Sequence, residues 1–194
     1  MKHIIILIMM LTTNIIVSAQ SFNGNIILGF NASQVDGDEQ QGFKKAGLKG
    51  GFTVSVRDEE TLSYESGLIF SNRGAKKVEN GYSYLKTSFN YIEVPVLLNI
   101  KFLDRYYATV GLSYNALMSS RITDATGYVE KNSTFMRDHD ANIVAGLKVS
   151  FANSLEFRVT YNYSIFCIAE DQNSRFWRNN LLGFTLVKKL SFRN

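Results

Sequence analysis

Apolar and polar residues alternate along most of this 194-residue chain. In residues 46–57, Leu48 and Phe52 lie at even-numbered positions among small or apolar neighbours. Lys49 and Thr53 lie at odd-numbered positions of the same run. Because successive side chains of a β-strand point to opposite faces, this pattern predicts strands with one apolar and one polar face. Eight such runs predict eight strands, the last three being less regular: 46–57, 92–102, 106–116, 140–151, 155–164, 25–33, 62–73 and 181–192.

The connections between these runs alternate in length. The long ones are 34–42, 74–88, 119–137 and 169–179, and the tight ones are 58–61, 103–105 and 152–154. Short turns at one end and longer loops at the other, with an even strand number, are typical of outer-membrane barrels. A run of about 12 residues at about 3.3 Å each, tilted near 45°, rises about 28 Å, close to the required apolar band. We therefore expect an all-β fold, an eight-stranded antiparallel up-and-down transmembrane β-barrel.

Alternation alone leaves open which face points inward, because a soluble small-ligand-binding barrel would turn its apolar face to the interior. The polar face is rich in Gly, Ser, Thr and Asn and carries few charges, which suits a narrow interior. Aromatic residues flank two of the tight turns, as at a lipid–water interface: Phe102, Tyr106, Phe151 and Phe157. The last run is amphipathic and has Phe192 near its end, although Lys188 falls on its apolar face. We therefore expect the apolar face to meet lipid.

The interior of an eight-stranded barrel is just wide enough to be filled by side chains. Isolated charges there are costly, so charges on the polar face are expected to form ion pairs. The alternative is a polar conduit for ions or small solutes. The residues expected in this structural, luminal charge network are Lys49, Glu65, Glu93, Lys101, Lys148, Glu156 and Arg158.

The composition excludes or disfavours several other classes of protein. The formal net charge is +4, and the basic residues are interspersed with acidic ones, which disfavours a nucleic-acid partner. Cys167 is the single cysteine, which excludes an intramolecular disulfide and a zinc site made of cysteines. The mean hydropathy of -0.06 fits strands whose two faces cancel in the average.

The first 19 residues are expected to be a signal peptide. Lys2 supplies the positive charge, residues 4–17 are mostly apolar, and Val17, Ser18 and Ala19 form a small-residue cleavage site. Residues 20–194 would then form the barrel domain. This organisation predicts a location in the cell outer membrane of a Gram-negative bacterium.

His139 is the single histidine outside the predicted signal peptide. It lies between Asp138 and Asp140, and an Asp–His pair can act as a general base in a barrel hydrolase or acyltransferase. Neighbours on a strand point to opposite faces, however, and no nucleophile stands out, so we expect no catalytic residues. The acidic residues 36–39 lack the spacing of a calcium loop, so neither a metal nor a cofactor is expected.

Several short motifs resemble the PorT-like outer-membrane β-barrel proteins of Bacteroidota. Residues 29–33 with 42–52 look like the opening hairpin of that family, and residues 64–75 look like its third strand and the Ser-x-(Lys/Arg)-Gly-Ala turn. Residues 91–98, Tyr-Ile-Glu-Val-Pro-Val-Leu-Leu, are similar to its most recognisable element, and residues 111–114 fit its fifth strand. The resemblance implies an eight-stranded outer-membrane barrel. The family's name-giving member assists the secretion of proteases through the type IX pathway.

Taken with this resemblance, the sequence predicts a non-enzymatic outer-membrane barrel that is structural or accessory to transport or secretion. Its expected partners are outer-membrane lipids and possible secretion or envelope proteins. Pro95 lacks a backbone N–H for the sheet ladder, so we expect it to mark a bulge, with Glu93 directed into the lumen.

Overall fold

The computed structural model describes residues 22–37, 42–57, 61–79, 82–123, 126–131, 136–152, 154–170 and 176–190. The predicted signal peptide, Phe192 and part of the acidic stretch 36–39 lie outside these ranges. Within them, no helix is long and apolar enough to cross a membrane. The same residues contain no group of three or more His, Cys, Asp or Glu side chains that could hold a metal ion.

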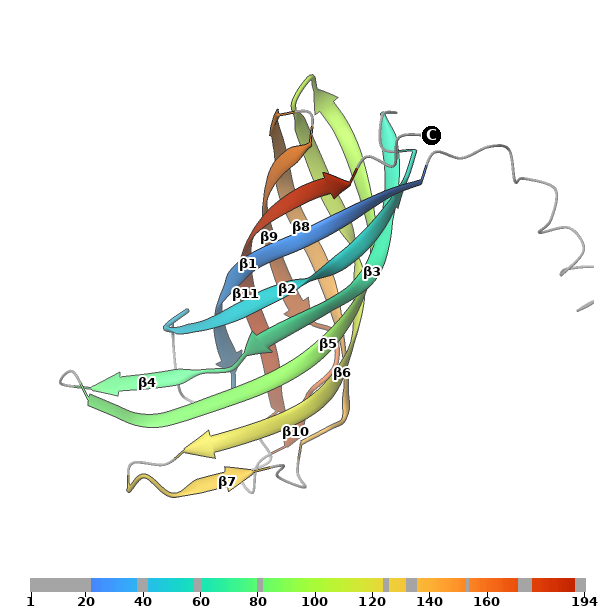
Figure 1. Ribbon diagram of the computed structural model, residues 1–194. Coiled ribbons are helices and arrows are strands. Elements are labelled where there is room, and N and C mark those ends of the chain that lie inside the picture. The colour runs from blue at the N-terminus through green and yellow to red at the C-terminus, as the bar shows by residue number, and fades with distance from the viewer. Residues whose placement is uncertain are drawn as a thin grey trace, which may run out of the picture.

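The chain folds into a closed antiparallel barrel (Figure 1). Its strands are β1 (Phe22–Asp36), β2 (Lys45–Val56), β3 (Leu62–Arg73), β4 (Lys76–Glu79), β5 (Tyr82–Leu103), β6 (Tyr106–Thr123), β7 (Val129–Lys131), β8 (His139–Ala152), β9 (Leu155–Ser164), β10 (Ala169–Glu170) and β11 (Phe176–Leu190). The eight long strands pair in the order β1, β2, β3, β5, β6, β8, β9, β11. β11 then pairs with β1, from Gly24 opposite Leu190 to Asp36 opposite Arg178, which closes the barrel. The predicted eight-stranded up-and-down barrel is confirmed.

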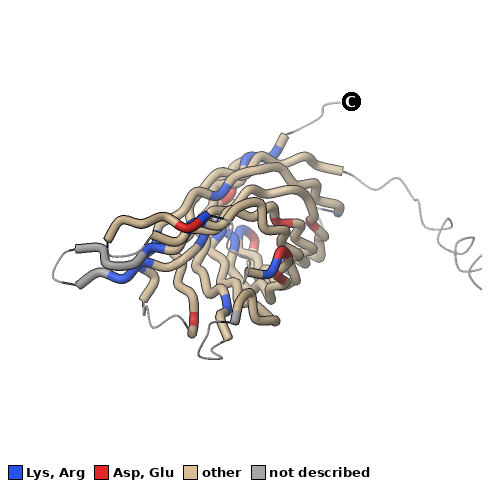
Figure 2. The backbone as a smooth tube through the Cα atoms, turned by 90° about the horizontal axis from the view of Figure 1, so that it is seen from below, with Lys and Arg blue, Asp and Glu red and all other residues tan. Residues whose placement is uncertain are grey.

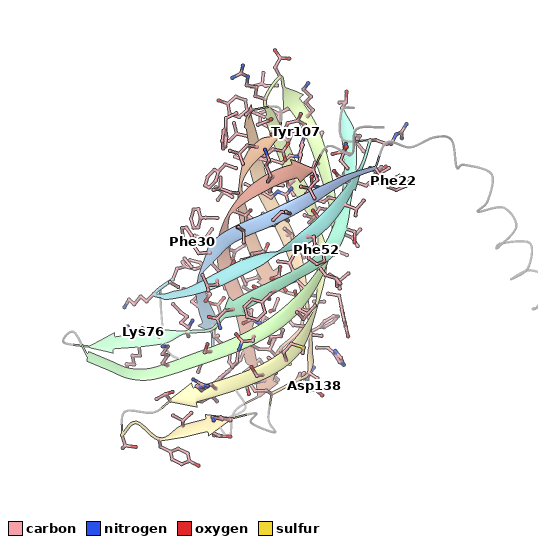
Figure 3. The ribbon with its side chains drawn as sticks, in the orientation of Figure 1. Phe22, Phe30, Phe52, Lys76, Tyr107 and Asp138 are labelled. Carbon is pink, nitrogen blue, oxygen red and sulfur yellow. The ribbon has the colours of Figure 1, made fainter. Side chains whose placement is uncertain are left out.

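The outer wall of the barrel is apolar, and its interior is largely polar apart from a buried apolar cluster at the loop end that includes Phe89, Tyr91 and Trp177. Leu48 and Phe52 on β2 are 73% and 66% exposed, whereas Lys49 and Thr53, each the next residue along the strand, are buried. Phe22, Phe30 and Phe52 follow the outer wall (Figure 3). At the tight turns Phe102, Tyr106 and Phe151 are exposed on the same outer wall, and Phe157 is half-buried. This is the inverse of a soluble barrel and the arrangement required where the outer wall meets lipid.

The two ends of the barrel differ. At the turn end, adjacent strands are joined by the short connections 57–61, 104–105 and 153–154. At the loop end, β4, β7 and β10 add further pairing to the long strands. We call β4, β7 and the adjoining parts of β5 and β6 (82–90 and 119–123) the extension. Both views show the extension bending away from the rest of the barrel (Figures 1 and 2).

All four stretches predicted as long loops contain strand residues, so those predictions were wrong in part; in the first, residues 34–36 belong to β1. Residues 74–88 include β4 and the start of β5, residues 119–137 include the end of β6 and β7, and residues 169–179 include β10 and the start of β11. The cause is visible on β5, where Lys86 and Ser88 lie on the face that carries apolar side chains further along the strand. Polar residues on both faces hide the alternation although the backbone remains extended.

Gly74 and Met118 mark where the extension begins. Gly74 has a φ of +142°, and a Cβ atom there would lie 2.1 Å from the carbonyl oxygen of Thr87. This position therefore requires glycine. Across the sheet, Asn90 pairs with Ser119 but Tyr91 pairs with Leu117, so Met118 is the additional residue of a β-bulge.

Pro95 does not form the predicted bulge. The pairing between β3 and β5 has the same register on both sides of Pro95, with Ser66 opposite Val96 and Ile69 opposite Glu93. The ladder is only interrupted between these pairs, as expected for a residue that cannot donate a backbone hydrogen bond. Glu93 is buried and directed into the interior, as predicted.

Candidate functional site

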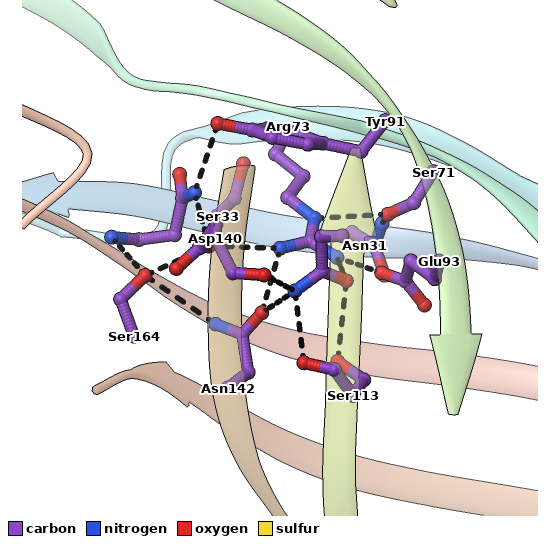
Figure 4. A network of polar contacts seen from close by, with 12 residues as sticks. Asn31, Ser33, Ser71, Arg73, Tyr91, Glu93, Ser113, Asp140, Asn142 and Ser164 are labelled. Carbon is purple, nitrogen blue, oxygen red and sulfur yellow. Dashed lines mark hydrogen bonds and ion pairs between the residues drawn. The ribbon is translucent and has the colours of Figure 1, made fainter. Parts of the chain in front are cut away.

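Arg73 lies at the centre of a charged cluster inside the loop-end half of the barrel (Figure 4). Its side chain is fully buried, and its Nη2 atom donates to Oε1 of Glu93. Lys49 Nζ lies 2.9 Å from the second oxygen of Glu93. Arg73 Nη1 lies 3.6 Å from Oδ2 of Asp140. We call Lys49, Arg73, Glu93 and Asp140 the loop-side network, in which two cations are balanced by two carboxylates.

Neutral side chains hold the Arg73 guanidinium from several strands. Nη2 donates to Asn115 Oδ1 at 2.9 Å, and Nη1 donates to Asn142 Oδ1 at 3.1 Å. Nε donates to Ser71 Oγ at 3.2 Å. The guanidinium also lies 4.9 Å from the centre of the Tyr91 ring, within the range of a cation–π contact. These contacts join β3, β5, β6 and β8 across the interior.

Asp140 extends the same network to β9 and β11. Its Oδ2 atom accepts hydrogen bonds from Ser164 Oγ at 2.9 Å and from Asn179 Nδ2 at 3.0 Å. The backbone N–H of Asn179 donates to Ser164 Oγ at 2.9 Å. The carboxylate is therefore held by neutral donors as well as by Arg73.

A second cluster, which we call the turn-side network, lies nearer the turn end. Arg158 forms a two-pronged ion pair with Glu65, with N–O distances of 3.1 and 2.5 Å. Thr53 Oγ1 donates to Glu65 at 2.8 Å. Glu156 forms ion pairs with Lys148 and Lys189, with N–O distances of 3.1 and 2.9 Å. Lys148 Nζ also lies 4.5 Å from the centre of the Tyr107 ring.

Six of the seven residues predicted for the luminal network lie in these two clusters. Lys49 and Glu93 lie in the loop-side network, and the turn-side network contains Glu65, Lys148, Glu156 and Arg158. Lys101 is half-buried at the end of β5 and forms no ion pair with any residue that the structure describes.

Sequence reasoning missed three charged members: Arg73, Asp140 and Lys189. Arg73 was assigned to a turn motif, although it has the same odd parity as Glu65 and Ser71, which both point inward. Asp140 was considered as a partner of His139, although it shares the polar face of its run with Asn142. The parity of each strand, continued to its last residue, could have identified both side chains.

The interior contains little free space between the networks. A cavity of about 20 Å³ is lined by Lys49, Glu93, Pro95 and Arg158, among other residues. That volume holds about one water molecule. The carboxylates and cations of the two networks fill the cross-section of the lumen. They also neutralise one another, and buried charges require such pairing.

His139 lies on the outer wall, apart from the networks. It is exposed, and its Nδ1 atom lies 2.6 Å from the hydroxyl of Tyr114, with the two rings stacked 5.6 Å apart. Asp140, the next residue, points into the interior. His139 and Asp140 therefore lie on opposite faces and do not form the Asp–His pair considered from the sequence.

Comparisons with known proteins agree with this architecture. A family model described as an outer membrane protein β-barrel domain matches residues 18–170. The fold is similar to Neisserial surface protein A, with a TM-score of 0.54 and 11% identity over 89% of this chain and 100% of that one. It is also similar to Ail, the attachment invasion locus protein of Yersinia pestis, solved in complex with the heparin analogue sucrose octasulfate. The TM-score there is 0.51, at 12% identity over 88% of this chain and 99% of that one.

A major outer membrane protein from Thermus thermophilus has a TM-score of 0.50 and 13% identity, covering 89% of this chain and 100% of its own. At these identities the likeness is one of fold. No curated protein matches the sequence.

Proposed function

The chain belongs to the family of outer membrane protein β-barrel domains, and we propose that it is a non-enzymatic barrel, structural or accessory to transport or secretion. Its matched region includes most of the barrel, and its apolar outer wall is that of an outer-membrane protein. In this proposal the barrel anchors the loop-end surface at the membrane, and that surface contacts the partners of the protein.

The observation that carries the proposal is the filled interior. The loop-side and turn-side networks occupy the lumen at two levels, and the cavity between them has a volume of only about 20 Å³. Solutes of nutrient size need a water-filled channel, which larger barrels provide. A barrel filled in this way acts through its two ends rather than through its lumen.

The loop end differs from the turn end in carrying the extension. The extension there is built from paired strands, which hold a defined shape better than a loop would. The stretch 91–98 also resembles the PorT-like proteins, and Glu93 within it is central to the loop-side network. This resemblance favours an accessory role in secretion, in an organism of the Bacteroidota, with residues 1–19 removed as a signal peptide.

The test is complementation of a deletion strain. The strain receives either the wild-type gene or a variant in which residues 76–86 are replaced by Asn-Gly. The backbone N–H of Thr87 already donates to the carbonyl of Ala75 at 2.9 Å, so this pair can close a two-residue hairpin. Faster migration of the unboiled variant on a gel, as for the wild type, shows that the shortened barrel is folded.

We expect deletion to change the proteins found in the culture medium and on the cell surface. The wild-type gene should restore the parental profile, and the shortened variant should not, because it lacks part of the extension. A deletion strain with unchanged secreted proteins, surface proteins and envelope integrity would contradict the proposal.

A further inference from the structure

A pocket of about 510 Å³ lies at the loop end, where the extension leaves the barrel. Its lining includes four cations: Lys45, Lys86, Arg121 and Lys131. The described residues that line it include no Asp or Glu. Figure 2 shows several Lys and Arg positions gathered along the extension. We call this the cationic pocket.

Two pairs of like charges face each other across the strands of the extension. Lys76 lies directly opposite Lys86 between β4 and β5. Arg121 lies directly opposite Lys131 between β6 and β7. Like charges in such positions destabilise a sheet. Packing therefore does not explain this arrangement, whereas an anion bound between the cations would relieve their repulsion.

A chain of hydrogen bonds forms one side of the cationic pocket. Lys45 Nζ donates to Asn72 Oδ1 at 2.7 Å, and Asn72 Nδ2 donates to Asn90 Oδ1 at 2.6 Å. Asn90 Nδ2 in turn donates to Ser119 Oγ at 2.9 Å. Lys45 lies at the loop end of β2, before the outward apolar residues begin, and its burial, with the charge of Lys86, lowers its pKa. Because the lining holds four basic side chains and no described carboxylate, the pocket has an excess of positive charge.

An apolar groove of about 410 Å³ adjoins the cationic pocket on the outer wall. Asn72 and Asn90 line both, so the two spaces lie next to each other. The rest of the groove is formed chiefly by Phe30, Ala46, Leu48 and Phe70. These residues belong to the outer wall that meets lipid. Figure 3 shows Phe30 on this wall and Lys76 on the extension.

The direction in which the pocket faces follows from strand parity. Lys86, Ser88 and Asn90 share a face of β5 with Ile92, which belongs to the lipid-facing wall. Because the extension bends outward (Figures 1 and 2), this continuation of the outer face is turned toward the membrane surface beside the barrel. The cations therefore face the region where lipid headgroups lie.

We propose that the cationic pocket and the apolar groove form one binding site for a phosphate-bearing lipid of the leaflet next to the loop end. The phosphate lies among the cations, and an acyl chain lies along the groove between Phe30 and Phe70. This site depends on the outer-membrane location but not on a role in transport or secretion, so it goes beyond the proposed function.

The first test measures lipid binding by mass spectrometry of the intact full-length mature protein released from detergent micelles. Dioleoyl phosphatidic acid is compared with dioleoyl phosphatidylcholine, which has the same chains but a capped phosphate. The variant Lys86→Gln/Arg121→Gln removes two lining cations. Each cation near an anionic lipid contributes about fivefold to binding, so this variant should bind phosphatidic acid about 30-fold more weakly.

The matched control is Arg105→Gln/Lys188→Gln, which removes the same charge from exposed positions at the turn end. It should bind phosphatidic acid as tightly as the wild type. Equal binding by the wild type and both double variants would overturn the proposal, as would equal binding of the two lipids to the wild type.

The second test separates a lipid from a free phosphate. Ala46→Phe fills the groove, and Ala108→Phe, on the outer wall near the turn end, is its control. We expect Ala46→Phe to weaken phosphatidic acid binding about tenfold and Ala108→Phe to leave it unchanged. Phosphatidic acid that binds both variants equally, and is displaced by inorganic phosphate, would overturn the lipid site and indicate a site for a soluble anion.

A stability measurement separates ligand binding from a structural role of the cations. In micelles without anionic lipid, Lys86→Gln/Arg121→Gln should unfold at the same or a higher urea concentration than the wild type, because it removes repulsion. A lower unfolding midpoint would show that these cations stabilise the fold, and would contradict their assignment to a ligand. In the secretion experiment above, the comparison of the deletion strain with the wild-type gene does not depend on these results, whereas the shortened variant also removes Lys86 of the cationic pocket.

Discussion

The interior of the barrel and the outer face of its extension both contain several cations, but the neighbours of these cations differ. Inside, Arg73 and Lys49 contact Glu93, and Arg158 contacts Glu65. On the extension, Lys86 faces Lys76 across the sheet. The interior therefore balances charge within the chain, whereas the extension concentrates charge of one sign.

The difference follows from hydration. A buried charge without a partner costs several kcal/mol, so the interior tolerates cations only beside carboxylates. At a lipid–water boundary a cation keeps part of its hydration, and two like charges on adjacent strands cost only about 1 kcal/mol or less. Paired charges thus indicate a structural role, and facing like charges indicate a surface for an anionic partner.

The largest effect is expected when a carboxylate of the loop-side network is removed. Glu93→Ala leaves Arg73 and Lys49 buried without their shared partner, which should lower the free energy of unfolding by about 3–5 kcal/mol. Urea unfolding in lipid vesicles, followed by the fluorescence of Trp177, measures it. Ser66→Ala, on the outer wall, is the control and should change little. An unchanged midpoint for Glu93→Ala would remove the distinction between the two regions.

The ion pair of the turn-side network provides a sharper test of pairing. Glu65→Leu or Arg158→Met alone leaves one buried charge uncompensated and should cost about 3 kcal/mol. The double variant leaves neither charge and should lie within about 1 kcal/mol of the wild type. A double-mutant cycle in vesicles measures the coupling. Additive losses would mean that the two side chains stabilise the barrel separately.

A smaller effect is expected at the start of the extension. Gly74→Ala places a Cβ atom against the Thr87 carbonyl at a φ of +142°, which alanine rarely adopts. The strain should cost about 2 kcal/mol. It should appear chiefly as faster proteolysis of residues 76–90 in the folded protein. Gly127→Ala, which has open space around it, is the control for local crowding.

The smallest effect is expected for one cation of the extension. Lys86→Gln removes a repulsion with Lys76 and should change the free energy of unfolding in zwitterionic micelles by no more than about 0.5 kcal/mol. The measurement is the same urea titration as for Glu93→Ala. A loss comparable to that of Glu93→Ala would show that the extension, like the interior, needs its cations for stability.

The barrel could be predicted from the sequence because lipid imposes a strict rule on every second residue. Residues such as Leu48 and Phe52 must be apolar if they face the membrane, so period two persists through each spanning strand. The same alternation identified Lys49, Glu65 and Glu93 as inward-pointing, because they lie at the polar positions between the apolar ones. The fold class and most strand positions follow from this one rule.

The extension was missed because that rule stops where the strands leave the lipid. Lys86 and Ser88 lie on the outer face of β5, so the outer face of that segment is polar and the alternation that marks the spanning strands is lost. The bulge at Met118 also shifts the parity of β6. Which cation pairs with which carboxylate depends on barrel closure and register, and a local pattern contains neither.

The most direct test of the account is the ion conductance of the wild-type protein in a planar lipid bilayer. Insertion is checked independently by flotation with vesicles and by faster migration of the unboiled protein on a gel. Because the two networks fill the lumen, we predict no discrete conductance steps above those of the bare membrane. Reproducible steps with a stable open state would contradict a filled lumen and would indicate a channel instead.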